Sequence, residues 1–394
     1  MISRMELRDW RRLLLPRAAG RAGYFAFPEE TTRGNRLQLL EDGREAYPAM
    51  LAAIAAARET VHLETYILRA DKAGRLFSDA LIERARHGVA VRLIFDAVGS
   101  LDLPGSFVQA LRNAGVQVLE YHPVAPWRPR WAWGRRDHRK TLVVDGSVAF
   151  TGGVNISEVY LPPEQGGSGW RDLHVRVEGP AAYDLDRLFR QVWHSKTGRW
   201  FPLVGQPGER HGHSLVHVAA NSEFLRRQLI RRALLHSIRR SRRRVVGAVA
   251  YFIPDRRVRR ALFSAVKRGV RVDLLVPEVS DIPAVAYASQ FYYDTLLSHG
   301  VRLHAWPGTV LHAKAFAVDR LWASIGSYNI TNRSLVSNLE VNLNVLDRGF
   351  AGRLEEVITS DIARSREIKL DEWRKRPYSE LVLERLFWLL RSWF

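Results

Sequence analysis

One sparse pattern occurs twice in this chain of 394 residues. Both copies follow H-x-K-x4-D-x6-G-x2-N, the first over residues 138–155 and the second over residues 312–329. If each fixed residue type has a frequency of roughly one in twenty, five fixed positions recur by chance about once in three million starting points. The repetition therefore predicts a duplicated fold in which each copy supplies half of one site.

The spacing within each copy predicts a hairpin. His138 and Lys140 are two residues apart at the start of an apolar, β-branched run, so on a strand both side chains point to the same face. Asp145 and Gly146 form a typical hairpin turn pair after this run. We therefore interpret Asp145, and Asp319 in the second copy, as turn residues.

Each returning strand ends at small residues and then an asparagine. Gly153 and Ser327 leave room for a ligand to approach the backbone, and Asn155 and Asn329 add an amide near the same place. Together with the two histidines and the two lysines, these residues would surround one phosphoryl group with hydrogen-bond donors. The set favours phosphodiester chemistry.

The paired motif resembles the HKD motifs of the phospholipase D superfamily. Four other segments, at residues 62–67, 86–89, 248–255 and 338–342, are similar to those of bacterial cardiolipin synthases of the B type. The similarity extends from about Arg33 to about Asp361. It implies two phospholipase D-like α/β/α lobes, related by pseudo-two-fold symmetry, with the active site at their interface.

The order of predicted elements agrees with two lobes. Strand patterns such as Thr60–Ile67 and Val245–Phe252 alternate with helical patterns such as Ala284–His299, which predicts an α/β fold with a largely parallel sheet. The Pro-, Gly- and His-rich stretch Gly205–His213 marks the boundary. We expect a basic N-terminal segment (1–33), two phospholipase D-like lobes (34–205 and 206–361) and a C-terminal amphipathic membrane-associating segment (362–394).

The resemblance also implies roles for the site residues. In the family the N-terminal motif commonly supplies the nucleophile, so His138 would form a phosphohistidine and His312 would act as general acid and base. Asp172 and Glu340 match the acidic positions after each motif and would orient the histidines, with the pairing left open. Asp145 and Asp319 match the motif aspartates and are included among the catalytic candidates. Gly153 departs from the family, which often has Ser there.

The phosphoryl oxygens would be stabilised by side-chain donors alone, namely by Lys140, Lys314, Asn155 and Asn329. Because these donors replace a cation, we expect no metal ion and no cofactor.

The charge balance indicates an anionic partner. The formal net charge is +19, no cysteine is present, and 12 tryptophans occur, many near arginine. Charge alone suits either nucleic acid or an anionic bilayer, and the tryptophans favour the membrane interface. Residues 121–136 contain Trp127, Trp131 and Trp133 just before a catalytic strand. They are predicted to contact lipid headgroups, the alternative being that they pack on the lobe.

The C-terminal run 378–394 suits an interfacial helix in which Phe387, Trp388 and Trp393 contact the membrane. The alternative is a helix packed on the second lobe or on another subunit. No run of 18 apolar residues exists, so membrane contact should be peripheral. We expect it on the cytoplasmic face of the bacterial inner membrane.

The predicted function is transfer of a phosphatidyl group between two phosphatidylglycerol molecules, which gives cardiolipin and glycerol. Two alternatives use the same two-histidine chemistry, namely a hydrolytic phospholipase D and a nuclease. A third alternative is a non-catalytic module that binds anionic lipid. The tryptophan-rich loop and the apolar tail favour lipid, so nucleic acid is not the expected partner. The sequence does not determine the oligomeric state or the exact donor and acceptor lipids.

Overall fold

The computed structural model describes residues 24, 26–27, 30–125, 127, 134–205, 209–221 and 228–394. In these ranges the first half of the chain contains the following elements: β1 (Thr31–Glu41), α2 (Asp42–Ala55), β2 (Thr60–Thr65), α3 (Lys72–Arg86), β3 (Ala90–Asp96), α4 (Gly105–Asn113), β4 (Gln117–Tyr121), β5 (Thr141–Val144), β6 (Val148–Gly152), η2 (Glu158–Tyr160), η3 (Pro163–Gln165), β7 (Leu173–Glu178) and α5 (Pro180–Thr197).

The second half repeats this order and adds a C-terminal part. Its elements are β8 (Ser214–Asn221), α6 (Leu229–Arg240), β9 (Arg244–Val249), α7 (Arg256–Lys267), β10 (Arg271–Val279), α8 (Pro283–Gln290), α9 (Tyr293–Ser298), β11 (Arg302–Val310), β12 (Lys314–Val318), β13 (Trp322–Gly326), α10 (Asn332–Val336), β14 (Glu340–Leu346), α11 (Arg348–Ala363), β15 (Arg366–Ile368), α12 (Leu370–Trp373), α13 (Tyr378–Leu389) and η4 (Arg391–Trp393).

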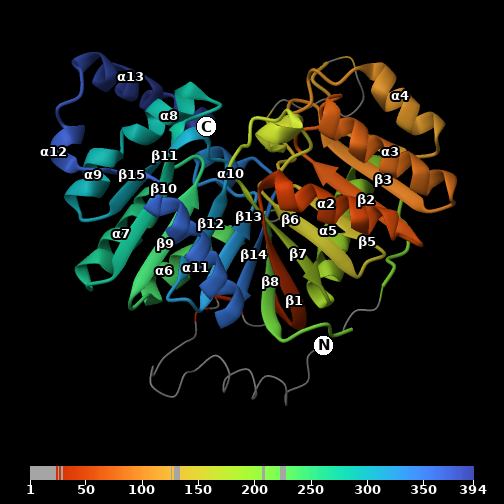
Figure 1. Cartoon of the computed structure of the whole chain (residues 1–394), viewed down its shortest axis with the longest axis horizontal. Helices are drawn as coiled ribbons and strands as arrows, with labels where there is room; N and C mark the ends of the chain where they lie inside the picture. The colour runs from red at the N-terminus through yellow and green to blue at the C-terminus, as the bar shows by residue number, and fades with distance from the viewer. Residues whose placement is uncertain are drawn as a thin grey trace.

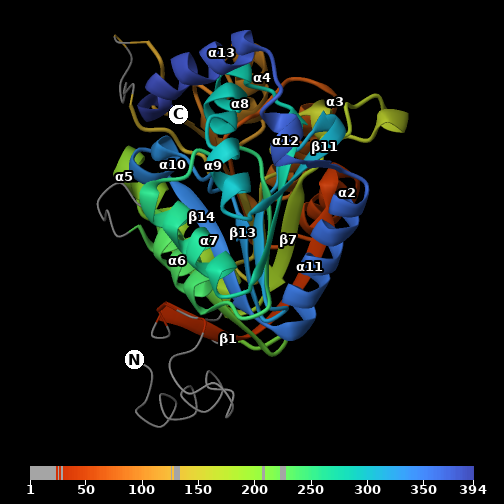
Figure 2. The same ribbon diagram turned by 90° about the vertical axis from the view of Figure 1, so that its left-hand side faces the viewer.

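All the described strands join one sheet, in the order β15-β11-β10-β9-β12-β13-β14-β8-β1-β7-β6-β5-β2-β3-β4 (Figure 1). The two halves meet where β1 pairs antiparallel with β8, and the order on one side mirrors that on the other. This arrangement confirms the predicted pseudo-two-fold relation. Helices α5, α6 and α7 cover one face of the sheet and α2 and α11 the other (Figure 2).

The prediction of a largely parallel sheet was wrong. Only β2-β3-β4 and β9-β10-β11 pair in parallel. The motif strands instead form hairpins, β5-β6 and β12-β13, and these hairpins lie antiparallel to β2 and β9. The short connection within a hairpin forces antiparallel pairing, whereas a parallel pair needs a crossover helix.

The hairpin turns follow the prediction. Asp145 and Gly146 have φ of 48° and 62°, and Asp319 and Arg320 have φ of 56° and 54°. The Asp145 carboxylate accepts hydrogen bonds from three backbone N–H groups at the start of β2, and Asp319 accepts three at the start of β9. Both motif aspartates thus fasten the turn of the hairpin to the neighbouring strand. They lie at the opposite end of that strand from the histidine, which corrects their inclusion among the catalytic candidates.

Candidate active site

The two motifs meet because the segment that precedes each motif strand forms a β-bridge with the other half, Asp137 with Leu339 and Leu311 with Arg171. The His138 N–H donates to Leu339 O at 3.0 Å, and the His312 N–H donates to Arg171 O at 2.7 Å. Leu339 and Arg171 are the residues that directly precede the two candidate orienting acids. Backbone pairing therefore carries each acid across the interface to the histidine of the other half.

The side chains form a crossed arrangement, in which the histidine of each half contacts the acid of the other half. His138 Nδ1 lies 3.0 Å from Glu340 Oε2, and His312 Nδ1 lies 2.7 Å from Asp172 Oδ2. Both carboxylates are fully buried, and the histidines are 7% and 4% exposed. The pairing that the sequence left open is thus crossed.

The opposite ring nitrogen of each histidine is free for chemistry. Within the described ranges, Nε2 of neither histidine has a hydrogen-bond partner. With Nδ1 donating its proton to a carboxylate, Nε2 carries the lone pair that can attack phosphorus or accept a proton. The carboxylate beside each Nδ1 favours this tautomer and fixes the orientation of the ring.

Burial controls the protonation of these histidines. It lowers the pKa of His138 to about 4, and Glu340 opposes this shift. Burial also lowers the pKa of His312, and the charge of Lys314 lowers it further. For both rings, burial favours the neutral form. An anionic phosphate that entered the site would favour the protonated form.

The two motif lysines lie beside the histidines. Lys140 Nζ donates to His138 O at 2.7 Å, and Lys314 Nζ lies 2.9 Å from His312 Nδ1. Burial lowers the pKa of Lys140 to about 7 and that of Lys314 to about 8, against the raising effects of Glu340 and Asp172 respectively. These two desolvated cations attract an anionic group.

Gly153 and Ser327 lie against the two carboxylates that contact the histidines, Asp172 and Glu340. A Cβ atom on Gly153 would lie 2.0 Å from Asp172 Oδ1, so a serine here would clash with that carboxylate. At the equivalent place Ser327 Oγ donates to Glu340 Oε2 at 2.5 Å. The departure of Gly153 from the family pattern thus has a steric reason. Both residues contact carboxylates behind the histidines, whereas the sequence interpretation placed them against phosphate.

The two motif asparagines differ. Asn155 Nδ2 donates to Tyr160 Oη at 2.9 Å, and its Oδ1 accepts from the Ile67 N–H at 3.1 Å, so this amide is engaged within the protein. Asn329 Oδ1 is buried and has no hydrogen-bond partner among the residues that the structure describes. Asn329 lines a small cavity together with Lys314, so it is the asparagine that faces open space beside a motif lysine.

Aromatic side chains that the motif spacing does not indicate form the walls of the site. Tyr66 packs edge-on against His138, with ring centroids 4.8 Å apart. The rings of Tyr160, Trp170 and Tyr251 surround His312 at centroid distances of 5.8, 5.8 and 6.2 Å. Such walls exclude water and strengthen the electrostatic interactions inside. Tyr66 and Tyr251 lie in two of the segments that resemble cardiolipin synthases, which was the available signal.

A buried acid pair beside His138 was also missed. Burial and then the charge of Glu64 raise the pKa of Asp137 well above its ordinary value, and Arg139 lies 4.0 Å from Glu64. The second copy of the motif has Leu311 and Ala313 where the first has Asp137 and Arg139. The surroundings of the two histidines are therefore not equivalent.

Comparison with known proteins assigns the family. The family model described as "Cardiolipin synthase, PLD-like domain" matches residues 50–193 and 234–362. The chain belongs to this family. It is 35% identical over 344 residues to cardiolipin synthase A of Pseudomonas aeruginosa, which covers 87% of this chain and 70% of that protein. It is 33% identical over 385 residues to cardiolipin synthase 2 of Bacillus anthracis, covering 96% and 73%. The predicted family is thus confirmed, while these two relatives carry the names A and 2 in place of B.

Solved structures share the fold of this cardiolipin synthase family member. A phosphatidylserine synthase from Haemophilus influenzae superposes with a TM-score of 0.69 at 13% identity, covering 90% of this chain and 95% of that one. A polyphosphate kinase from Porphyromonas gingivalis superposes with a TM-score of 0.54 at 14% identity, covering 83% and 50%. At such low identity the likeness establishes the fold alone, and it confirms the predicted fold class.

The predicted membrane contacts divide into three groups. Trp127 and Trp393 are 84% and 72% exposed. Trp131 and Trp133 lie outside the described residues. Phe387 and Trp388 stack on Tyr287 and Phe291 of the α8 region, so α13 uses this face to pack on the second half. Both rings remain half-buried, so their contact with lipid stays a prediction.

The described ranges lack both a metal-binding cluster and a membrane-spanning helix. No group of three or more His, Asp or Glu side chains there could hold a metal ion. None of the helices in those ranges has the length and apolar character needed to cross a bilayer.

Proposed function

We propose that the protein transfers a phosphatidyl group from one phosphatidylglycerol to the hydroxyl of another through a phosphohistidine, releasing cardiolipin and glycerol. The chain is a phospholipase D-type phosphatidyltransferase by family, and its substrates are phospholipids. The observation that carries the proposal is the crossed pairing of two buried histidines with two buried acids at one interface.

In the first step, Nε2 of His138 attacks phosphorus and the bond from phosphorus to the glycerol oxygen breaks. His312, protonated once the anionic substrate is bound, donates its proton to that oxygen. Glu340 accepts the Nδ1–H of His138 and stabilises the positive charge that develops on the phosphorylated ring. The asymmetric surroundings of His138 do not by themselves choose the nucleophile, and this choice rests on the family resemblance.

In the second step, His312 removes a proton from the hydroxyl of the second phosphatidylglycerol. The resulting oxygen attacks phosphorus, the bond from phosphorus to His138 breaks, and the enzyme returns to its starting state. Two phosphodiesters are consumed and two are formed across the cycle, so no external energy source is required. Lys140, Lys314 and Asn329 supply the donors that stabilise charge on the non-bridging oxygens.

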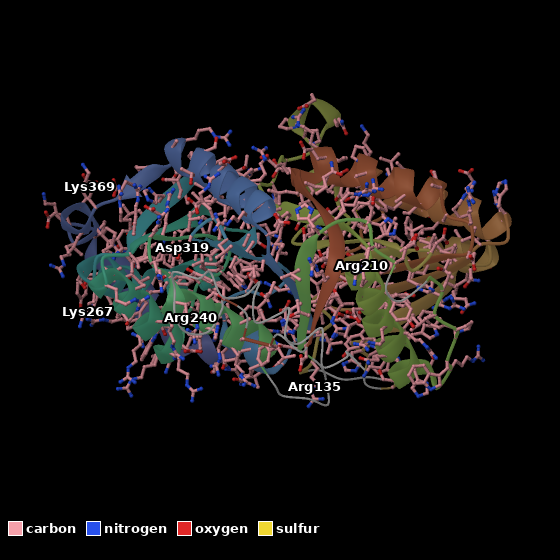
Figure 3. All side chains as sticks on the ribbon, turned by 90° about the horizontal axis from the view of Figure 1, so that it is seen from below. Arg135, Arg210, Arg240, Lys267, Asp319 and Lys369 are labelled. Carbon is pink, nitrogen blue, oxygen red and sulfur yellow. The ribbon has the colours of Figure 1, made fainter. Side chains whose placement is uncertain are left out.

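The predicted location of the protein at the membrane surface is part of the same proposal. Peripheral binding to the cytoplasmic face of the bacterial inner membrane is supported by the net charge of +19 and by the exposed Trp127 and Trp393. Basic side chains such as Lys267 and Lys369 project from the periphery of the second half (Figure 3). The division of the chain at residues 205/206 and the assignment of residues 362–394 to membrane association also remain proposals.

The direct test is incubation with vesicles of phosphatidylglycerol labelled in its glycerol headgroup, with the lipid and water-soluble products resolved. The proposal expects cardiolipin and free glycerol in equal amounts, and neither in the His138→Ala variant. Phosphatidic acid as the main product would identify a hydrolytic phospholipase D instead. Cleavage of DNA without any lipid product would identify a nuclease.

A further inference from the structure

A second cavity lies directly behind the wall of the catalytic centre. Its volume is about 400 Å³, within the range of about 300–1,000 Å³ that is typical of ligand pockets. Tyr328 and Ile330 line this cavity, and they also line the small cavity that contains Lys314 and Asn329. These two side chains, which flank Asn329 in the sequence, are shared by the walls of both cavities.

The lining of the large cavity suits an apolar ligand. Much of it is contributed by apolar side chains, namely Ile253, Pro254, Val258, Tyr328, Ile330, Leu335 and Leu389. Several polar groups of the lining are already engaged by the protein. Asp255 caps α7 and pairs with Arg231, Asn332 Nδ2 donates to Ser392 O, and Tyr292 Oη accepts from Trp388 Nε1. An apolar ligand would leave none of these groups without a partner. The lining also contains Arg391, whose guanidinium donates to Trp388 O at 3.0 Å and stacks on the Trp388 ring.

The mouth of the cavity connects with an exposed apolar stripe. Leu389 lies on its rim and is 65% exposed. The exposed side chains of the same helix and of η4 recur at helical spacing on one face, at Val382, Leu386, Leu389, Leu390 and Trp393. The opposite face of α13 packs over α8 (Figures 1 and 2). A lipid chain lying along the stripe would therefore reach the cavity at Leu389.

We propose that this cavity binds one acyl chain of a phospholipid substrate, next to the position of its phosphate. The inference rests on the proposed function, since a phosphatidyl group brings acyl chains to within the reach of Asn329. It adds that the C-terminal segment, through α13 and η4, forms one wall of the substrate site. The enzyme would then respond to acyl chain length, independently of how strongly it binds a membrane.

The test uses phosphatidylglycerols with acyl chains of six, seven and eight carbons, kept below the concentration at which they aggregate. As monomers they remove membrane binding from the comparison. A methylene group that enters an apolar pocket from water is worth up to about fourfold in affinity. In the wild-type protein, kcat/KM should rise by up to about that factor for each added carbon. Leu389→Trp and Leu335→Trp, which fill the cavity, should flatten the rise while activity on the six-carbon lipid persists.

Leu386→Trp is the matched control, because Leu386 is 52% exposed on the same helix and does not line the cavity. It should keep the wild-type slope. An equal slope in the two filled variants, or no slope in the wild type, would overturn the inference while leaving the proposed function intact. Absence of cardiolipin from every lipid would instead contradict the proposed function.

A second measurement does not depend on any variant. Eight-carbon phosphatidylglycerol with a photoreactive diazirine at the end of one chain is irradiated on the wild-type protein, and the adducts are mapped by mass spectrometry. Adducts within residues 253–258, 328–335 or 389–392 support the proposal. Adducts found only elsewhere contradict it.

Discussion

Replacing Glu340 by glutamine should show whether this acid stabilises the positive charge on His138 during the reaction or only maintains the structure. Glu340 is fully buried and accepts hydrogen bonds from His138 of the other half and from Ser327. Glutamine keeps the size of the side chain and an oxygen that can accept the Nδ1–H. It removes the negative charge that stabilises a positive imidazole ring.

The expected loss follows from this contact. A hydrogen bond to a charged group is worth about 1.5–3 kcal/mol, which corresponds to about 10- to 150-fold in rate. We expect kcat for cardiolipin formation to fall within that range. Glu340 also raises the pKa of Lys140, which burial lowers to about 7. Without the carboxylate this pKa falls further, so the alkaline decline of kcat/KM should move to lower pH.

The assay is cardiolipin formation from labelled phosphatidylglycerol between pH 5.5 and pH 9, with circular dichroism to verify folding. Glu355→Gln is the control, because Glu355 is a buried acid of the same half that lies 3.7 Å from Arg244 and contacts neither histidine. It should leave the rate and the pH profile unchanged. A Glu340→Gln enzyme with the rate and the profile of the wild type would refute the role given to the crossed acid.

Three further outcomes are expected. A phosphatidyl ester of p-nitrophenol has a leaving group that needs no proton. With this substrate the His312→Ala variant should still release p-nitrophenol, and the His138→Ala variant should not. The reverse result would exchange the roles of the two histidines. For the wild type, kcat/KM should decline as pH rises through about 7 to 8, because the lowered pKa of Lys140 means that its charge is present below that range and lost above it; activity that is constant up to pH 9 would contradict this. Replacing Leu386 and Trp393 together by serine should weaken flotation with anionic vesicles at high salt more than at low salt, because apolar area is removed without a change in charge; equal flotation of variant and wild type would show that the stripe does not contact lipid.

Local spacing was sufficient to predict the parts of the structure that local rules govern. Asp145 with Gly146 predicted the turn of the hairpin, whereas His138 and Lys140, predicted to lie on one face of the strand, both precede β5. The duplicated motif predicted two related halves and one shared site. The helix predicted over Ala284–His299 is two helices, α8 and α9, separated by Phe291 and Tyr292. Periodicity alone does not detect such a break.

Features that depend on contacts between the halves were not predictable from spacing. Strand β1 (Thr31–Glu41) carries arginines and a glycine, so its sequence does not indicate a central strand, yet its backbone pairs with β8. The choice of Glu340 for His138, and of Asp172 for His312, depends on the backbone pairing across the interface. The packing of Phe387 and Trp388 depends on the position of α8, because an apolar helix face suits lipid and protein equally well.

The covalent intermediate tests the central claim most directly. Wild-type enzyme mixed with an excess of phosphatidylglycerol is quenched within one turnover in alkali, which preserves phosphohistidine, then digested and mapped by mass spectrometry. We expect a phosphatidyl adduct on His138, formed and lost at rates consistent with turnover and absent from His138→Ala. An adduct on His312, or turnover in the His138→Ala variant, would contradict the account.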